Sequence, residues 1–175
     1  MRWTCVPFAE LSVQQLYAAL ALRSEVFVVE QQCIFLDIDG LDPQVWHLLG
    51  HGDDGSLKAY LRLLPPGLKG PDAIIGRVVT APSARSGGVG RALMTEALVQ
   101  CERLWPGQPI TLHAQAHLER FYASFGFVPV GEHYMEDGIQ HIEMNNRSPQ
   151  SAQAPQPPEG VEQARGGPSL AQETP

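Results

Sequence analysis

The chain of 175 residues lacks long apolar runs, paired cysteines and an excess of basic side chains. No apolar run approaches the 18 residues that would suggest a membrane span, and no basic segment followed by an apolar core marks a signal peptide. Cys5, Cys33 and Cys101 are odd in number and form no C-x-x-C pair, so neither a disulfide framework nor a zinc knuckle is predicted. These absences favour a cytoplasmic location without a membrane anchor.

Basic charge is also scarce. The net charge of −7 and the pI near 5.3 argue against a broad surface for nucleic acid or anionic membranes, and they mildly favour a cationic partner. The length and the 43% hydrophobic content suit one globular domain with a well-sized core.

Several ligand and catalytic motifs are missing as well. No Lys-Ser or Lys-Thr pair follows the glycines of residues 85–90 as in a P-loop, the spacing of these glycines is not G-x-G-x-x-G, and the sequence has no G-x-S-x-G. Asp37, Asp39 and Gly40 lack the further ligands of a calcium loop. The sequence therefore predicts no P-loop, dinucleotide fold, serine nucleophile or calcium site.

Two histidine pairs have a spacing of four residues, which on a helix would suit zinc. His47 and His51 fall on a predicted strand, where four residues span roughly 13 Å. His113 and His117 straddle a predicted strand end, and no Glu suited to act as a base lies between them. No metal site is predicted.

The elements that are present predict a mixed α/β (α+β) domain over residues 1–146, with a mostly antiparallel sheet. Gly-Asp-rich turns predict hairpins, and the order strand, helix, strand around residues 74–114 predicts one right-handed parallel pair. In the first helix, Val13, Leu16, Tyr17 and Leu20 are expected to face the core. We expect strands at residues 2–8, 45–51, 58–64, 74–80, 110–114, 127–134 and 139–145, and helices at 13–28, 90–105 and 118–125.

Two segments are not predicted to form helices or strands. Residues 30–43 are acidic and irregular and are predicted to be a loop, which either is plain solvated surface or lines a pocket for an amine. Residues 147–175 lose all aromatic side chains and are rich in Pro, Gln, Ala, Gly and Glu, so we expect a disordered tail.

The turn at residues 85–90, Arg-Ser-Gly-Gly-Val-Gly, follows a strand and opens a helix. Glycines let backbone approach a ligand, and the positive end of a helix dipole favours an anion such as pyrophosphate. A tight connection without a ligand is an equally valid interpretation of such a turn when it is considered alone.

A second motif, Phe-Tyr-Ala-Ser-Phe-Gly-Phe at residues 121–127, follows in the order found in the GNAT superfamily of N-acetyltransferases, which the chain before the tail resembles. Residues 27–31, 37–40, 114–118 and 136–138 followed by His141 are similar to its ElaA-type branch. The resemblance implies helices on both faces of the sheet, a splayed parallel pair, and direct transfer of acetyl from acetyl-CoA to an amine.

The resemblance also implies site residues. Tyr122 matches the tyrosine that protonates the leaving thiolate, and a backbone N–H near Val79 matches the donor to the thioester oxygen. A hydroxyl with a pKa near ~10 is protonated at neutral pH and suits the first role. The implied acetyl-CoA site comprises Val78, Val79, Thr80, Arg85, Ser86, Gly87, Gly88, Val89, Gly90 and Arg91.

The base that deprotonates the amine is left open, because the strand at residues 74–80 lacks the Glu that many relatives have there. Arg77 on this strand either binds a substrate carboxylate or pairs with an acid of the loop. Candidates for the base are Glu30, Asp37, Asp39, His113 and His117, and candidates for substrate contacts are Glu30, Gln31, Asp37, Asp39, Arg77 and His117.

The acceptor stays open too. A small-molecule amine is favoured over a protein amine, and an acetyl-CoA-binding module without turnover is the non-enzymatic alternative. We expect a monomer or homodimer.

Overall fold

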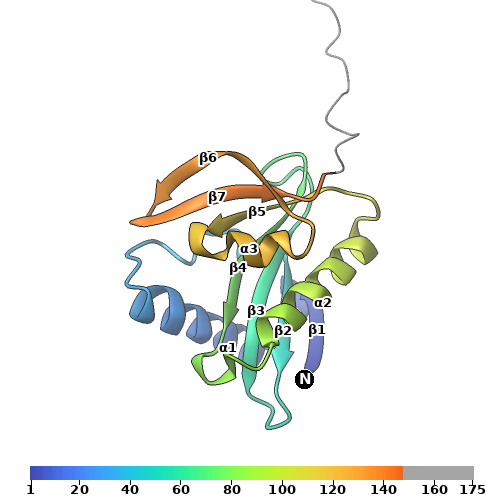
Figure 1. The fold of residues 1–175 in the computed structure, drawn as a ribbon. Coiled ribbons are helices and arrows are strands. Elements are labelled where there is room, and N and C mark those ends of the chain that lie inside the picture. The colour runs from blue at the N-terminus through green and yellow to red at the C-terminus, as the bar shows by residue number, and fades with distance from the viewer. Residues whose placement is uncertain (148–175) are drawn as a thin grey trace, which may run out of the picture.

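The computed structural model describes residues 1–147, which form one mixed seven-stranded sheet flanked by helices (Figure 1). The strand order is β1-β2-β3-β4-β5-β7-β6, and every neighbouring pair is antiparallel except β4 and β5. The predicted mixed sheet with one parallel pair is therefore confirmed. The strands are β1 (Arg2–Pro7), β2 (Trp46–His51), β3 (Leu57–Leu64), β4 (Ala73–Thr80), β5 (Ile110–Gln115), β6 (Val128–Glu136) and β7 (Ile139–Asn145).

Helices cover both faces of the sheet. On one face, α2 (Val89–Leu104) packs its buried Leu93, Met94, Ala97 and Cys101 against the central strands, beside α3 (Glu119–Ala123). On the other face, α1 (Val13–Arg23) packs against Tyr60 of β3. The next residue, Leu61, packs in the core beneath α2, because successive side chains of a strand point to opposite faces of the sheet. Short 3₁₀ turns complete the order: η1 (Phe8–Glu10), η3 (Asp42–Gln44), η4 (Pro82–Ala84) and η5 (Ala116–Leu118).

The expected core face of the first helix is wrong. Val13 and Tyr17 are 79% and 75% exposed, whereas Ala19, Leu22 and Arg23 are buried. The helix is amphipathic, but its buried face is rotated from the predicted one. The buried face includes Arg23, whose partners Asp37 and Asp42 come from a distant loop. The helix also changes winding at Ser24, where the π-helical turn η2 (Ser24–Glu30) begins.

The parallel pair is splayed. β4 and β5 pair only from Ala73 to Ile75 on one side and from Ile110 to Leu112 on the other, after which the strands part. The gap therefore opens beside the second half of β4.

A β-bulge lies where β4 leaves β5. Tyr60 of β3 pairs with Val79, but Arg62 pairs with Gly76, so two residues of β4, Arg77 and Val78, oppose the single Leu61. Arg77 has φ +54°, which is unusual for a residue with a side chain.

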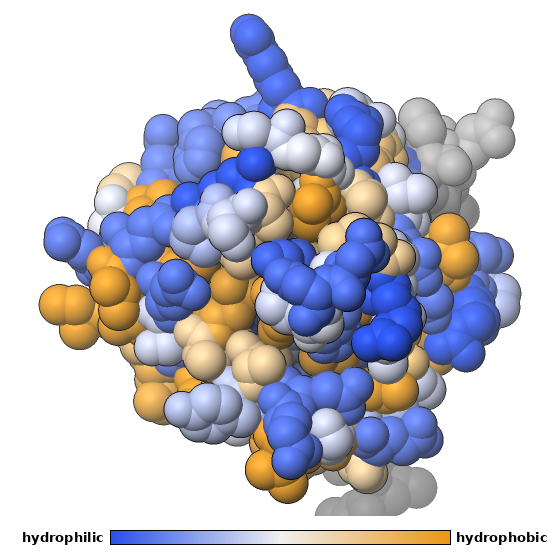
Figure 2. All heavy atoms as spheres, turned by 90° about the horizontal axis from the view of Figure 1, so that it is seen from below, coloured by the Kyte–Doolittle hydropathy of each residue, from blue (hydrophilic) through white to orange (hydrophobic). Residues whose placement is uncertain are grey.

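The hairpin of β6 and β7 turns at Asp137 and Gly138, both with positive φ, and its tip lies beyond the end of β5 because Gln115 pairs with His141. Of the expected tail, Arg147 is described and its Nε lies 3.2 Å from Asp72 Oδ2. Residues 148–175 lie outside the described part of the chain. Within residues 1–147, no helix combines the length and the hydrophobicity needed to cross a bilayer. Polar and apolar side chains are interspersed over the face seen from below (Figure 2).

Candidate active site

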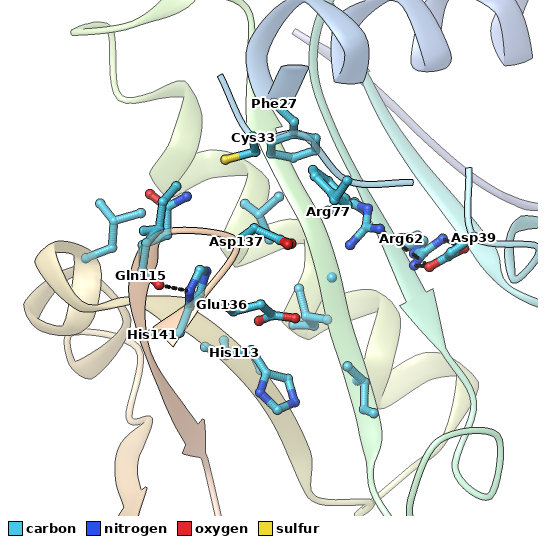
Figure 3. A pocket seen from close by; sticks show the side chains of 18 of the residues that line it. Phe27, Cys33, Asp39, Arg62, Arg77, His113, Gln115, Glu136, Asp137 and His141 are labelled. Atoms are coloured by element: carbon cyan, nitrogen blue, oxygen red, sulfur yellow. Dashed lines mark hydrogen bonds and ion pairs between the residues drawn. The ribbon is translucent and has the colours of Figure 1, made fainter. Parts of the chain in front are cut away.

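A cavity of about 490 Å³ lies at the opening between β4 and β5. Gly76, Arg77 and Val78 line it from β4, Leu112 and His113 from β5, and Tyr122 from α3. The loop after η2 and the β6–β7 hairpin complete its walls (Figure 3). The splay and the bulge thus create the hollow.

On one side of this cavity, Asp39, Arg62 and Arg77 belong to the lining. They are joined by ion pairs to the buried Arg23, Asp37 and Asp42, and we call these six residues the paired wall. Asp37 bridges two arginines, with Oδ2 2.9 Å from Arg23 Nε and Oδ1 2.7 Å from Arg77 Nε. Arg23 Nη1 also lies 2.9 Å from Asp42 Oδ1. Three arginines and three aspartates balance one another here: Arg23, Arg62, Arg77, Asp37, Asp39 and Asp42.

Asp39 belongs to the same network. It pairs with Arg62 and, at 3.5 Å, with Arg77. The hydrogen bond from Arg62 holds the pKa of the Asp39 carboxyl well below its usual range, so this group stays ionised and accepts protons poorly. Neither Asp37 nor Asp39 is free of an arginine.

Residues 85–90, the predicted phosphate cradle, lie at the start of α2. Ser86 and Gly88 have φ of +71° and +76°, and Gly88 is the N-cap without any side chain capping the helix. The first N–H groups of α2 are therefore left for a ligand or water. Gly90 packs close to Thr80 and Phe121, so the end of β4, the cradle and α3 converge.

Two arginines flank the cradle. Arg85 lies on the solvent side and forms a bidentate pair with Glu30, at 2.7 and 2.9 Å. Arg91 Nη2 lies 3.0 Å from Ser124 Oγ, and its guanidinium stacks over the Phe125 ring.

Tyr122 lies in the cavity wall with only 6% of its surface exposed. Phe121 and Phe127 contact its ring edge to face, and burial raises the pKa of the Tyr122 hydroxyl to about 12. The phenol therefore stays protonated at neutral pH.

The backbone of β4 presents alternate residues to the gap. Ala81 N–H donates to Lys58 O, so Val79, two residues earlier and in register with Tyr60, directs its N–H toward β3. Val78 lines the cavity, whereas the Val79 side chain packs in the core beneath α1. The register thus turns Val78 rather than Val79 toward the gap.

Other predicted site residues are spread out. Gln31 lines the cavity, and its Oε1 accepts from Gln115 Nε2 at 3.2 Å. His113 lines the cavity and lies 2.6 Å from Tyr134 Oη, whereas His117 is exposed on η5 outside the lining. Glu30 lies at the cradle with Arg85. Among residues 1–147, no three His, Cys, Asp or Glu side chains gather as a metal site.

The opposite side of the cavity, which we call the hairpin wall, contains two acids that the sequence analysis did not assign to the site. Glu136 and Asp137 line the cavity from the β6–β7 tip, and the Glu136 carboxylate points into it (Figure 3). Neither has an ion pair within the described residues. The sequence predicted a hairpin turn at residues 136–138. It did not predict that β7 pairs with β5, and this pairing brings the turn to the gap.

Comparisons with known proteins identify the family of the chain. Residues 48–148 match the acetyltransferase (GNAT) domain family. The chain is 48% identical over 146 residues to protein ElaA of Escherichia coli, covering 82% of this chain and 95% of ElaA. It is 44% identical over 149 residues to UPF0039 protein sll0451 of Synechocystis, covering 85% and 97%.

Solved structures give the same result. An acyl-CoA N-acyltransferase from Pseudomonas aeruginosa has a TM-score of 0.80 at 48% identity, with 84% of this chain and 100% of that chain covered. Escherichia coli ElaA has a TM-score of 0.78 at 47% identity, with 83% and 99% covered. The fold is that of the GNAT acetyltransferases, and the chain belongs to the GNAT acetyltransferase family. The resemblance to its ElaA-type branch is confirmed.

Proposed function

We propose that the protein is an N-acetyltransferase that moves acetyl from acetyl-CoA directly to the amine of a small molecule. The observation that carries the proposal is the convergence of a bulged, splayed β4, an uncapped α2 N-terminus and a buried Tyr122 around one opening. A thioester substrate with a pyrophosphate needs these parts together.

Acetyl-CoA fits along a path from the cradle to the cavity. Residues 86–91 supply N–H groups for the pyrophosphate, with Arg85 and Arg91 beside them. The free edge of β4 from Val78 to Thr80 offers backbone groups to the amide groups of the pantetheine arm.

Amine attack on the thioester forms a C–N bond, breaks the C–S bond, and builds negative charge first on oxygen and then on sulfur. The Val78 N–H faces the gap and is our candidate donor to the oxygen, in place of Val79. Tyr122 gives its proton to the departing sulfur, which its raised pKa allows throughout the neutral range.

For the base we propose Glu136. Its carboxylate points into the cavity and has no arginine partner among residues 1–147, unlike Asp37 and Asp39. It would take the amine proton directly or through one water. His113 is the second candidate, because it also lines the cavity.

A small amine fits better than a protein amine, because about 490 Å³ lies within the usual range of small-molecule pockets. The three arginines and three aspartates of the paired wall balance, and Glu136 and Asp137 outnumber Lys69, the other charged residue of the lining, so the site is attractive to a cation. The three cysteines are unpaired, in keeping with the reducing cytoplasm.

The test is acetyl-CoA turnover against polyamines, amino sugars, amino acids, simple amines and peptides, with released thiol and acetylated product both measured. We expect turnover with at least one small cationic amine. Saturable acetyl-CoA binding without turnover across the panel would instead favour the binding module, and turnover only with peptides would favour a protein amine.

A further inference from the structure

We infer that Asp37 is a positioning residue that keeps the acyl-CoA cleft open by holding Arg77 in its left-handed bulge conformation. The inference rests on the proposed function in one respect, since it takes the gap beside β4 as the acyl-CoA site. Asp37 then has a structural role, whereas the sequence analysis listed it among the candidates for the base.

The bulge has a conformational cost at Arg77. Its φ of +54° lies in the left-handed region, which glycine adopts freely and residues with a Cβ adopt against steric resistance. In bulges of this kind the first residue is commonly glycine. Here an arginine occupies the position, so contacts of its side chain have to stabilise it.

Those contacts all come from residues 35–39. Arg77 Nε lies 2.7 Å from Asp37 Oδ1, Nη2 lies 3.3 Å from the Asp37 carbonyl oxygen, and the guanidinium stacks 4.9 Å from the Phe35 ring centroid. The contact with Asp39 Oδ2 is longer, at 3.5 Å. Asp37 is therefore the main anchor.

Asp37 is itself held in place by Arg23 of α1. The second Asp37 oxygen binds Arg23 Nε at 2.9 Å, and the Asp37 carbonyl oxygen accepts from Arg23 Nη2 at 2.8 Å. Arg23 is 1% exposed and lies on α1, with Asp42 on its Nη1. Asp37 thus transmits the position of α1 to the bulge.

The bulge decides which β4 residues face the cleft. It adds one residue opposite Leu61, just where pairing with β5 ends after Ile75. Without the extra residue, the alternation after Arg77 would shift by one, and Val78 and Val79 would exchange faces. The backbone groups offered to an acyl-CoA would then change.

The first test compares Arg77→Gly with Arg77→Ala, which both remove the guanidinium but differ in their tolerance of positive φ. We expect the acetyl-CoA Kd of Arg77→Ala to be about tenfold weaker than that of Arg77→Gly. Equal losses would overturn the inference, because they would mean that the arginine acts through its charge alone.

The second test uses Asp37→Asn, with Asp42→Asn as the matched control. Both remove a carboxylate charge from Arg23, but only Asp37 touches Arg77. We expect Asp37→Asn to weaken acetyl-CoA binding at least threefold more than Asp42→Asn does. The effect should shrink when Arg77 is already Gly. An undiminished effect in that background would contradict the inference.

A readout without acetyl-CoA separates the two proposals. Amide hydrogen exchange of residues 76–80 should be faster in Arg77→Ala than in Arg77→Gly, whether or not the chain binds acetyl-CoA. If the wild-type chain binds no acetyl-CoA but the two variants still differ in exchange, the proposed function fails and the inference stands. Equal exchange in the two variants would overturn the inference itself.

Discussion

The paired wall and the hairpin wall of the cavity carry similar numbers of acids but use them differently. On the paired wall, Asp37 and Asp42 are buried and bonded to arginines, and Asp39 is ionised by its pair with Arg62. On the hairpin wall, Glu136 and Asp137 face the cavity without an ion pair in the described chain.

This difference separates positioning from chemistry. A carboxylate fixed between arginines orders backbone and helix, and the lowered pKa of Asp39 makes that group a poor proton acceptor. An unpaired carboxylate in a cavity can take a proton or attract a cation. Substitutions on the paired wall should therefore lower stability, whereas substitutions on the hairpin wall should lower turnover and leave stability almost unchanged.

The largest effect is expected at Tyr122, which lines the cavity from α3 outside both walls. Tyr122→Phe keeps the ring and removes the acid, so kcat should fall about 10²–10⁴-fold. The acetyl-CoA Kd, measured by calorimetry, should change less than about threefold. Because the pKa is raised to about 12, the protonated form persists below that value, and wild-type kcat should show no tyrosine-dependent decline from pH 8 to 10. An unchanged kcat in the variant would remove Tyr122 from the mechanism.

The paired wall is tested by Arg23→Met, which leaves Asp37 and Asp42 buried without their shared partner. We expect urea unfolding to report a loss of about 3–5 kcal/mol. Arg85→Met, which breaks the solvent-exposed pair with Glu30, is the control and should change stability far less. Similar losses in both variants would mean that burial adds nothing to the paired wall.

The sequence was sufficient for the order and type of the elements, because strand alternation, glycine turns and the α2 stripe are local signals. It failed for the buried face of α1, where Ala19, Leu22 and Arg23 replace the apolar stripe at Val13 and Tyr17. Burial of Arg23 is favourable only together with its acidic partners from residues 37–42, and no local sequence pattern predicts that pairing.

The site divides in the same way. The cradle and Tyr122 follow from motifs, whose roles stay predictions. The bulge at Arg77, the pairing of Asp37 and the approach of Glu136 depend on sheet register and on strand order β5-β7-β6. These are long-range properties that a linear motif does not encode.

The hairpin wall is tested by Glu136→Gln, with Asp137→Asn as a control that removes the same charge from the neighbouring turn residue. We expect kcat with a strongly basic amine to fall about 10²-fold in Glu136→Gln. The fall should be smaller with a weakly basic amine, which is already neutral at pH 7. Unfolding free energy should stay within about 0.5 kcal/mol. A larger kcat loss in Asp137→Asn would transfer the role of base away from Glu136.

The smallest effect is expected at Glu30, whose pair with Arg85 lies outside both walls at the cradle. A pyrophosphate at the start of α2 would compete with Glu30 for the Arg85 guanidinium. Glu30→Gln should therefore tighten acetyl-CoA binding about two- to threefold at low salt, and the gain should fade as salt screens the exposed charges. Arg85→Gln is the matched control and should weaken binding instead. Weaker binding in Glu30→Gln would mean that Glu30 holds Arg85 in its binding position, and the exposed pair would then act like the buried pairs of the paired wall.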